Sequence, residues 1–137
     1  VFKLNSNLNY LIWSSYLGGN NDDAIYSITF DKDQDVYVAG GSVSHNMPTT
    51  QGVVDPHFNG GATDGFVAHI SKNGQTLKAL TYIGSPAYDQ CYFVRTDKQK
   101  DVYVVGQTKA SGYTFIKNAA YNKPNSGQFI VHLNNDL

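Results

Sequence analysis

Residues 31–40 read DKDQDVYVAG, and residues 97–106 repeat this stretch as DKQKDVYVVG. The two copies are 66 residues apart, and the same shift aligns residues 16–40 with residues 82–106 without a gap, at 11 identities in 25 positions. An unbroken match of this length indicates that the chain is built from a repeated structural unit.

A second segment recurs with nearly the same spacing. FVAHIS at residues 66–71 returns as FIVHLN at residues 129–134, which is 63 residues later, and the opening VFKLN is a third copy. The difference of three residues between the two spacings falls in a connection rich in Gly, Asn and Pro, where loops tolerate changes in length. The repeat therefore covers most of the chain.

Each repeat predicts four short strands. Residues 24–31 alternate in polarity, which places Tyr26, Ile28 and Phe30 on one face of the first strand. The polar turn DKDQD leads into VYVAG, and a tight turn at Asn73-Gly74 joins FVAHI to TLKALTYIG. We expect two repeat-related pairs to be buried, Tyr26 with Tyr92 and Ile28 with Val94.

A four-stranded unit with this period is typical of a blade of a β-propeller. A solenoid is the alternative, but solenoids usually have shorter periods and carry helices, and no apolar helical pattern is present. The predicted fold is all-β, a propeller fragment of four-stranded antiparallel blades with about two repeats of 63–66 residues. Residues 1–20 would form the last two strands of one blade, 21–84 a complete blade and 85–137 the first three strands of the next. We expect such a fragment not to fold alone, because its open faces need the rest of a polypeptide or a partner subunit to cover them.

Composition excludes several classes of partner. The chain has 137 residues and a net charge of −1, with no basic stripe that would indicate nucleic-acid binding. No apolar run approaches the roughly 20 residues that cross a bilayer, so no membrane span is expected. Cys91 is the single cysteine and cannot form an internal disulfide.

Several motifs together resemble the SBBP family of β-propeller repeats: Tyr16-Leu17-Gly18-Gly19 with Asp23, the DVYVAG strand, MPTTQG at 47–52 and GGATDGFVAHISKNGQTL at 60–77. The resemblance implies a large secreted or surface-exposed bacterial protein, often from Bacteroidetes with type IX secretion signals. The second repeat departs from the pattern, since Ser85 replaces the second glycine and residues 111–127 replace the proline–threonine segment.

The alternate carboxylates of Asp31, Asp33 and Asp35 are candidates for a calcium site. In the second copy the middle carboxylate is lost, because Gln99 stands between Asp97 and Asp101. That change favours a turn whose outer aspartates accept backbone N–H groups. We therefore expect no cofactor, and no three carboxylate or imidazole groups within metal-ligand distance of one another.

Other repeated positions have structural interpretations. Asp23 and Asp89 are expected to form hydrogen bonds that tie a strand end to a neighbouring connection. The alternative is that they belong to a ring of binding residues around the central channel of a propeller. Gly40 and Gly106 are repeated structural positions at the end of the second strand. His69 and His132 are equivalent to Lys3 in the third copy, which favours exposed, structural histidines over a metal pair.

Three further sets of residues are candidate sites. Cys91 has no adjacent base and is expected to be a buried, inert thiol. His45 and His57, with Asp55 between them, could approach one another but lack a metal-binding spacing. Four aromatic residues could stack on sugar rings if they were exposed together: Trp13, Tyr16, Tyr82 and Tyr113. Aromatic residues at strand positions are more often packed between blades.

The sequence favours a non-catalytic structural or protein-interaction module, located outside the cell or on its surface. Its partner would be the remainder of the same polypeptide or a partner subunit, with other surface proteins or glycans as further candidates. The alternative is a glycan- or calcium-binding adhesin module that uses the connections 42–65 and 108–127. A hydrolase with its site in the propeller channel ranks third, because no nucleophile motif is present.

Overall fold

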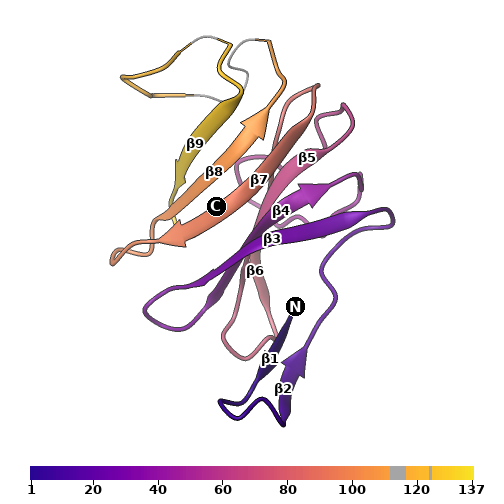
Figure 1. The fold of residues 1–137 in the computed structure, drawn as a ribbon, viewed down its shortest axis with the longest axis vertical. Coiled ribbons are helices and arrows are strands. Elements are labelled where there is room, and N and C mark those ends of the chain that lie inside the picture. Colours follow the sequence, from indigo (N-terminus) through magenta and orange to yellow (C-terminus); the bar gives the residue numbers. More distant parts are fainter. Residues whose placement is uncertain (112–116, 124) are drawn as a thin grey trace.

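The computed structural model describes residues 1–111, 117–123 and 125–137, and its regular elements are all strands. The nine strands are β1 (Phe2–Leu4), β2 (Leu11–Ser14), β3 (Asp23–Phe30), β4 (Val36–Ser42), β5 (Asp64–Ile70), β6 (Leu77–Ile83), β7 (Asp89–Thr96), β8 (Val102–Thr108) and β9 (Gln128–Leu133). They form three antiparallel sheets, β1–β2, β3–β4–β5–β6 and β7–β8–β9, arranged in series (Figure 1). The all-β prediction of four-stranded antiparallel blades is confirmed.

The β3–β6 sheet is packed on both faces, because β4 and β5 at its centre are buried along their whole length. One apolar cluster lies between this sheet and β7–β9 and includes Tyr37, Val94 and Val104. The cluster on the opposite face is built around Phe66 and contacts Trp13 of β2. Each sheet therefore depends on its neighbours for burial, which is the packing expected of successive blades.

The first strand of each unit contains a β-bulge. The pairing of β3 with β4 skips Tyr26, and the pairing of β7 with β8 skips Tyr92. A bulge adds one residue to a strand and reverses the alternation at that point. The expectation that Tyr26 shares a face with Ile28 and Phe30 is therefore wrong; the Tyr26 ring instead lies 5.6 Å from that of Tyr92.

The expected burial of the first strands holds only in part. Val94 is fully buried, as predicted, and Tyr92 is partly buried. The prediction is wrong for Tyr26 and Ile28, whose exposed fractions are 46% and 45%. Val94 packs against the complete β3–β6 sheet, whereas Ile28 lines an open apolar groove between β3 and the short β1–β2 hairpin. The repeat is equivalent in sequence, but the neighbouring sheet differs in extent.

Gly40 and Gly106 lie opposite these bulges. A Cβ atom on Gly40 would collide with the backbone carbonyl of Ala24 and would crowd the ring of Phe66. A Cβ on Gly106 would meet the equivalent carbonyl and ring, those of Gln90 and Phe129. The recurrence of glycine is thus explained by a close approach of backbone and ring that leaves no room for a side chain.

Candidate functional site

The turn between the first two strands of each unit is held by its first aspartate. Asp31 Oδ1 accepts the backbone N–H groups of Asp33 and Asp35, both at 2.9 Å. Asp97 repeats both bonds in the next unit, at 2.8 and 2.9 Å. This geometry uses the first aspartate and leaves the middle side chain free to change, which agrees with its replacement by glutamine in the second copy.

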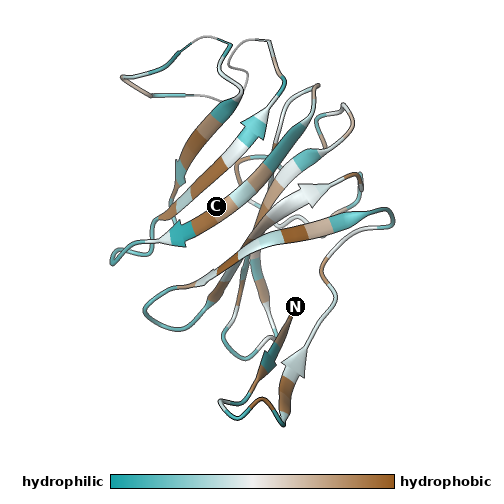
Figure 2. Cartoon of the chain, viewed as in Figure 1, coloured by the Kyte–Doolittle hydropathy of each residue, from teal (hydrophilic) through white to brown (hydrophobic). Residues whose placement is uncertain are grey.

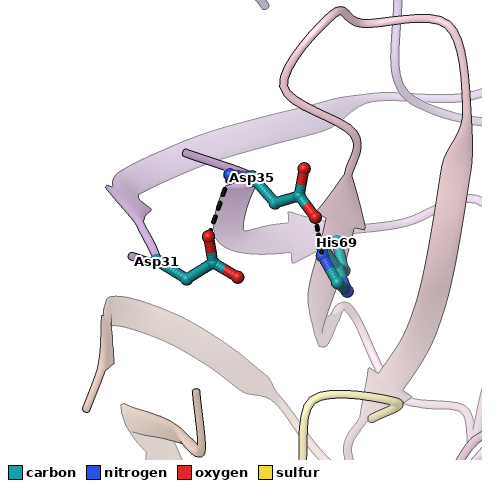
Figure 3. Close-up of side chains that lie close together, drawn as sticks. All are labelled: Asp31, Asp35 and His69. Atoms are coloured by element: carbon teal, nitrogen blue, oxygen red, sulfur yellow. Dashed lines mark hydrogen bonds and ion pairs between the residues drawn. The ribbon is translucent and has the colours of Figure 1, made fainter. Parts of the chain in front are cut away.

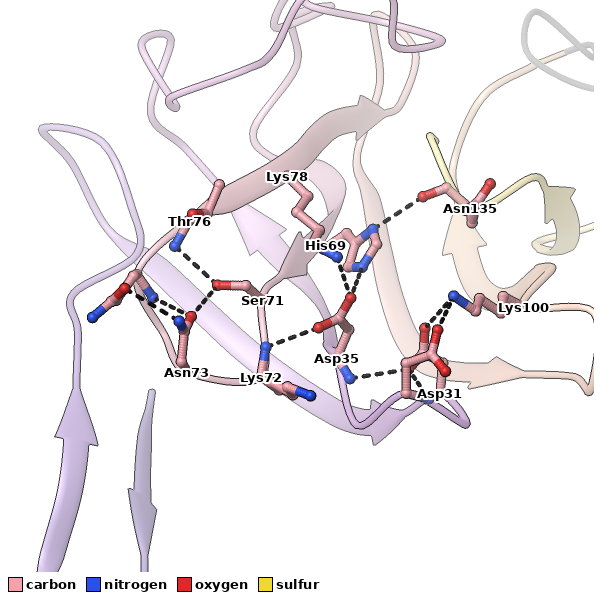
Figure 4. A network of polar contacts seen from close by, with 12 residues as sticks. Asp31, Asp35, His69, Ser71, Lys72, Asn73, Thr76, Lys78, Lys100 and Asn135 are labelled. Atoms are coloured by element: carbon pink, nitrogen blue, oxygen red, sulfur yellow. Dashed lines mark hydrogen bonds and ion pairs between the residues drawn. The ribbon is translucent and has the colours of Figure 1, made fainter.

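Asp35 connects this turn to the hairpin between β5 and β6. Its Oδ1 accepts the N–H of Lys72 at 2.9 Å, while its Oδ2 pairs with the Lys78 ammonium and lies 3.3 Å from His69 Nε2 (Figure 4). Burial acts to raise the pKa of Asp35, but the bonds from Lys78, Lys72 and His69 outweigh burial and lower it. The Asp35 carboxylate is therefore ionised at neutral pH.

His69 is buried, with 5% of its surface exposed, so the expectation of an exposed histidine is wrong at this position. Its ring stacks on that of Tyr37 at a centroid distance of 4.2 Å. Its Nδ1 lies 3.1 Å from the carbonyl oxygen of Asn135, which follows β9. His69 is covered because the next sheet packs over it, which no local sequence pattern reveals.

Lys100 reaches the same cluster from the opposite sheet. It lies in the turn between β7 and β8, and its ammonium pairs with Asp33. It also lies 4.0 Å from Asp31 Oδ2, a buried oxygen that has no hydrogen-bond partner among the residues that the structure describes. Lys100 and the Asn135 carbonyl therefore join β7–β9 to β3–β6 through polar contacts. We call Asp31, Asp35, His69, Lys78 and Lys100 the inter-blade junction.

The prediction that no three carboxylate or imidazole groups converge is wrong. Asp31, Asp35 and His69 each place one ligand atom within 4.8 Å of the other two (Figure 3). The prediction was wrong because comparing repeat-equivalent positions does not show which elements lie next to each other in space. Asp31 and Asp35 lie in the turn after β3, whereas His69 lies on β5. Convergence is produced by the pairing of Tyr37 with His69 in adjacent strands.

The junction has the charge balance of an ion-pair network. The Lys78 ammonium already pairs with Asp35, and Lys100 lies beside Asp31 and Asp33. Asp33, the third member of the calcium candidate, is half exposed and is turned towards Lys100. Because lysine ammonium groups neutralise these carboxylates, a divalent cation would have to displace them. The geometry therefore indicates a link between sheets.

The starts of β3, β5 and β7 carry a second group of carboxylates. Asp23 accepts the N–H of Gly19 at 2.7 Å and hydrogen bonds from Ser42 and Ser44. Asp89 accepts the N–H and hydroxyl of Ser85, at 2.7 and 2.6 Å. In both units the aspartate bridges a strand to the preceding connection, the contact expected of a structural residue.

Asp64, at the start of β5, is fully buried and accepts the N–H of Asn59 at 2.5 Å. Burial raises the pKa of Asp64 to about 7, and the neighbouring Asp89 carboxylate acts in the same direction. Oδ1 of Asp64 and Oδ1 of Asp89 are both buried, and neither has a hydrogen-bond partner among the described residues. This carboxylate is therefore held in the blade at a cost in free energy at alkaline pH.

The other sequence candidates are dispersed. Cys91 lies in the apolar cluster, where burial raises the pKa of its thiol. The His45 ring stacks on that of Phe58, at a centroid distance of 4.3 Å, and the backbone N–H of His57 donates to the Asp55 carboxylate. The aromatic candidates are separated: Tyr82 is buried, Tyr16 is fully exposed, Trp13 packs over Gly74, and Tyr113 lies outside the described residues.

Comparison with protein families agrees with this architecture. Residues 12–44 match the family model described as the SBBP beta-propeller repeat. This part of the chain is therefore similar to an SBBP β-propeller repeat. The matched residues run from β2 to the end of β4 and include Asp31 and Asp35 of the inter-blade junction. A search of the curated proteins finds no match for the chain.

Three contacts of the inter-blade junction were not predicted from the sequence: those of Lys78, Lys100 and Asn135. The repeat equivalent of Lys100 is Gln34, so the lysine is not a repeated residue and the comparison of repeats did not identify it as a contact residue. A signal did exist for the stacked pair, because Tyr37 and His69 both recur, as Tyr103 and His132. Repetition of two aromatic rings at facing strand positions predicts a cross-strand contact.

We expect Lys100→Met to destabilise the protein more than a substitution of an exposed lysine does, because the buried Asp31 carboxylate loses its nearest cation. Lys98→Met in the same turn is the matched control, since Lys98 is exposed and makes no ion pair within the described residues. Urea unfolding at neutral pH measures both. Equal effects of the two substitutions would contradict a role for Lys100 in the junction.

We expect Asp35→Asn to cost about 2 kcal/mol at pH 7, because it removes a charge that accepts bonds from Lys72, Lys78 and His69. The folded-state pKa of Asp35 is lowered, so its stabilisation is present above the unfolded value of 3.8 and is lost as the pH falls below it. The difference between wild type and variant should therefore shrink at about pH 2–3.

Asp101→Asn is the control for this substitution, because Asp101 is the repeat equivalent and pairs with a half-exposed His132. Its expected cost is under about 1 kcal/mol. Unfolding curves at several pH values compare the two variants. A pH-independent difference for Asp35→Asn would show that the carboxylate charge is not what stabilises the junction.

Proposed function

We propose that this chain is a non-catalytic structural and protein-interaction module of a larger β-propeller protein, secreted or displayed on a bacterial cell surface. The observation that carries the proposal is that the aspartate and histidine side chains of the inter-blade junction are occupied by contacts within the protein. Asp31 of the junction lies beside the Lys100 ammonium and His69 contacts the backbone carbonyl of Asn135, and both partners belong to the adjacent β7–β9 unit. Such contacts fix the position of one blade on the next.

The residues of the inter-blade junction are also poorly suited to catalysis. A general base must reach a substrate proton, yet Asp35 and His69 are buried and their polar atoms face Lys78 and Asn135. The Cys91 thiol is buried in the apolar cluster. These contacts support a structural role.

The glycan-binding alternative requires aromatic rings gathered on one exposed surface. Among the aromatic candidates that the structure describes, Tyr82 is buried and Trp13 packs on the β5–β6 turn, so only Tyr16 is freely accessible. The calcium alternative requires carboxylates without cationic partners, and Lys78 and Lys100 supply such partners. The observations therefore favour the structural role over both.

The structural role predicts that the two sheets unfold as one unit. Native-state hydrogen exchange would compare the amides of β4 and β8, which lie on either side of the shared apolar cluster. We expect their opening free energies to agree and to fall together in Lys100→Met. Independent opening of β8, with β4 unaffected, would contradict a module held by inter-blade contacts.

The proposed location is tested on intact cells of the source bacterium. An antibody raised against residues 1–137 should label unpermeabilised cells or detect the protein in the culture medium. Mild protease treatment of intact cells should remove the surface signal. Detection only after lysis would overturn the extracellular part of the proposal and would leave the structural part unaffected.

A further inference from the structure

A cleft lies where the starts of β3 and β7 meet. The two strands lie side by side, because the Val94 N–H donates to Ser27 Oγ at 3.2 Å and the Thr96 hydroxyl donates to the Phe30 carbonyl at 3.0 Å. Figure 2 shows hydrophilic residues at the starts of both strands. The cleft has a volume of about 290 Å³, and its lining includes Asp22, Tyr26, Gly41, Thr63, Tyr88 and Gln90. Both repeat units therefore contribute to it.

Tyrosine rings gather at this cleft and hold one another in place. Tyr26 is 46% exposed, and its ring lies 5.6 Å from that of Tyr92 at an interplanar angle of 41°. Gln90 Nε2 donates to the Tyr26 hydroxyl at 3.2 Å. A hydrogen bond with Tyr92 raises the pKa of Tyr88 to about 12, which connects the third ring to the other two. Rings that are positioned in advance lower the entropic cost of binding a ligand.

The walls of the cleft consist of side chains that the repeated unit does not require for folding. Tyr88 and Gln90 stand at the positions that Asp22 and Ala24 hold in the first unit. The first unit forms the same strand start with these shorter side chains. Gly41 leaves room for the longer ones, because a Cβ atom there would meet the Gln90 side chain at 3.0 Å. Tyr88 and Gln90 are therefore available for binding rather than demanded by the blade.

The charges around the cleft disfavour an ionic ligand. The carboxylates of Asp22 and Asp23 line the cleft and repel an anion. Lys109 Nζ lies 5.1 Å from the centroid of the Tyr88 ring, so a cationic ligand would compete with a cation that is already bound to this ring. A neutral ligand with an apolar face and several hydroxyl groups meets neither obstacle. Sugar rings have this chemistry.

We propose that this cleft binds one neutral sugar ring, a pyranose of a glycan. Tyr26 and Tyr88 would pack against the C–H face of the ring. Gln90 Oε1 and the Asp22 carboxylate would accept hydrogen bonds from its hydroxyl groups. This binding function goes beyond the structural role proposed above and uses none of the residues of the inter-blade junction. It also uses a different set of aromatic residues from the dispersed candidates that the sequence suggested.

The test measures sugar binding to the full 137-residue chain by saturation-transfer NMR. The probes are methyl α-D-glucopyranoside, methyl α-D-mannopyranoside and methyl β-D-galactopyranoside, and glucuronate and choline are the anionic and cationic comparisons. We expect at least one of the neutral pyranosides to bind with a Kd on the order of 1–10 mM, as a single small ring in an open cleft allows. The bound sugar should shift the ring resonances of Tyr26 and Tyr88 and leave those of the fully exposed Tyr16 unchanged.

Three variants locate the bound sugar. Gln90→Ala should weaken binding about fivefold or more and should still fold, because Ala24 holds this position in the first unit. Tyr88→Ala should weaken binding by a similar factor, since it removes one of the stacking rings. Tyr16→Ala is the matched control, because it removes an exposed tyrosine that does not line the cleft, and it should leave the Kd unchanged. Urea unfolding shows whether each variant is folded.

Three outcomes would overturn the proposal. The first is that none of the three pyranosides binds at concentrations up to about 50 mM. The second is wild-type affinity in both folded variants, Gln90→Ala and Tyr88→Ala, which would place the sugar elsewhere. The third is tighter binding of choline or glucuronate than of every neutral pyranoside, which would identify an ionic ligand. None of these outcomes bears on the coupled opening of β4 and β8, so failure here is distinguishable from failure of the structural role.

Discussion

Replacing Gly40 with alanine is expected to destabilise the complete blade by about 3 kcal/mol. The added Cβ would collide with the Ala24 carbonyl, which belongs to the bulged strand β3, and would crowd the ring of Phe66. Neither group can move freely, because β3 is hydrogen-bonded to β4 and Phe66 is fully buried. Urea unfolding with fluorescence detection measures the change.

Gly41→Ala is the matched control for this substitution. Its Cβ would meet only the side chain of Gln90, at 3.0 Å, and that side chain can shift. We expect Gly41→Ala to cost under about 1 kcal/mol. If the two alanine variants proved equally stable, the close approach of the bulge to Gly40 would not be the reason for the repeated glycine.

Replacing Asp64 with asparagine is expected to stabilise the protein at pH 8 by about 2–4 kcal/mol relative to its effect at pH 4. Burial raises the folded-state pKa of Asp64 to about 7, above its ordinary value of 3.8. A raised pKa means that the stabilisation is fully present below the unfolded value and is lost as the pH rises through about 7. Asparagine carries no charge at any of these pH values and so avoids the loss.

Thermal or urea unfolding across this pH range would show the difference between wild type and Asp64→Asn growing from pH 4 to pH 8. Asp22→Asn serves as the control for the chemical change from aspartate to asparagine, because Asp22 is exposed beside the start of β3. A constant difference for Asp64→Asn would mean that Asp64 is not the buried acid that titrates in this window.

Much of the fold was predictable from the sequence because the period is exact over the first two strands. An uninterrupted 66-residue shift locates equivalent strands and turns. The structure contains both predicted hairpins of the complete unit, β3–β4 and β5–β6, and the first hairpin of the next unit, β7–β8. Asp31 and Asp97 make the same backbone bonds, as a recurring aspartate at a turn predicts. These features depend on local chemistry, which a repeat copies faithfully.

The exposed faces were not predictable in this way. Ile28 and Val94 are equivalent in sequence, yet one is 45% exposed and the other fully buried. The bulge at Tyr26 also shifts the alternation by one residue, and neither strand announces it by an inserted glycine or proline. Burial depends on the neighbouring sheet, which is not a property of the strand itself.

The sequence by itself determined the repeated unit, its turns, its all-β architecture and the positions of its recurrent aspartates and glycines, because all of these follow from backbone and turn chemistry within one unit. Only the tertiary structure decided that Asp31, Asp35 and His69 meet, and that Lys78 and Lys100 neutralise them. The physical reason is that a buried charge requires a partner, and here the partners come from a hairpin more than 40 residues away and from the next sheet.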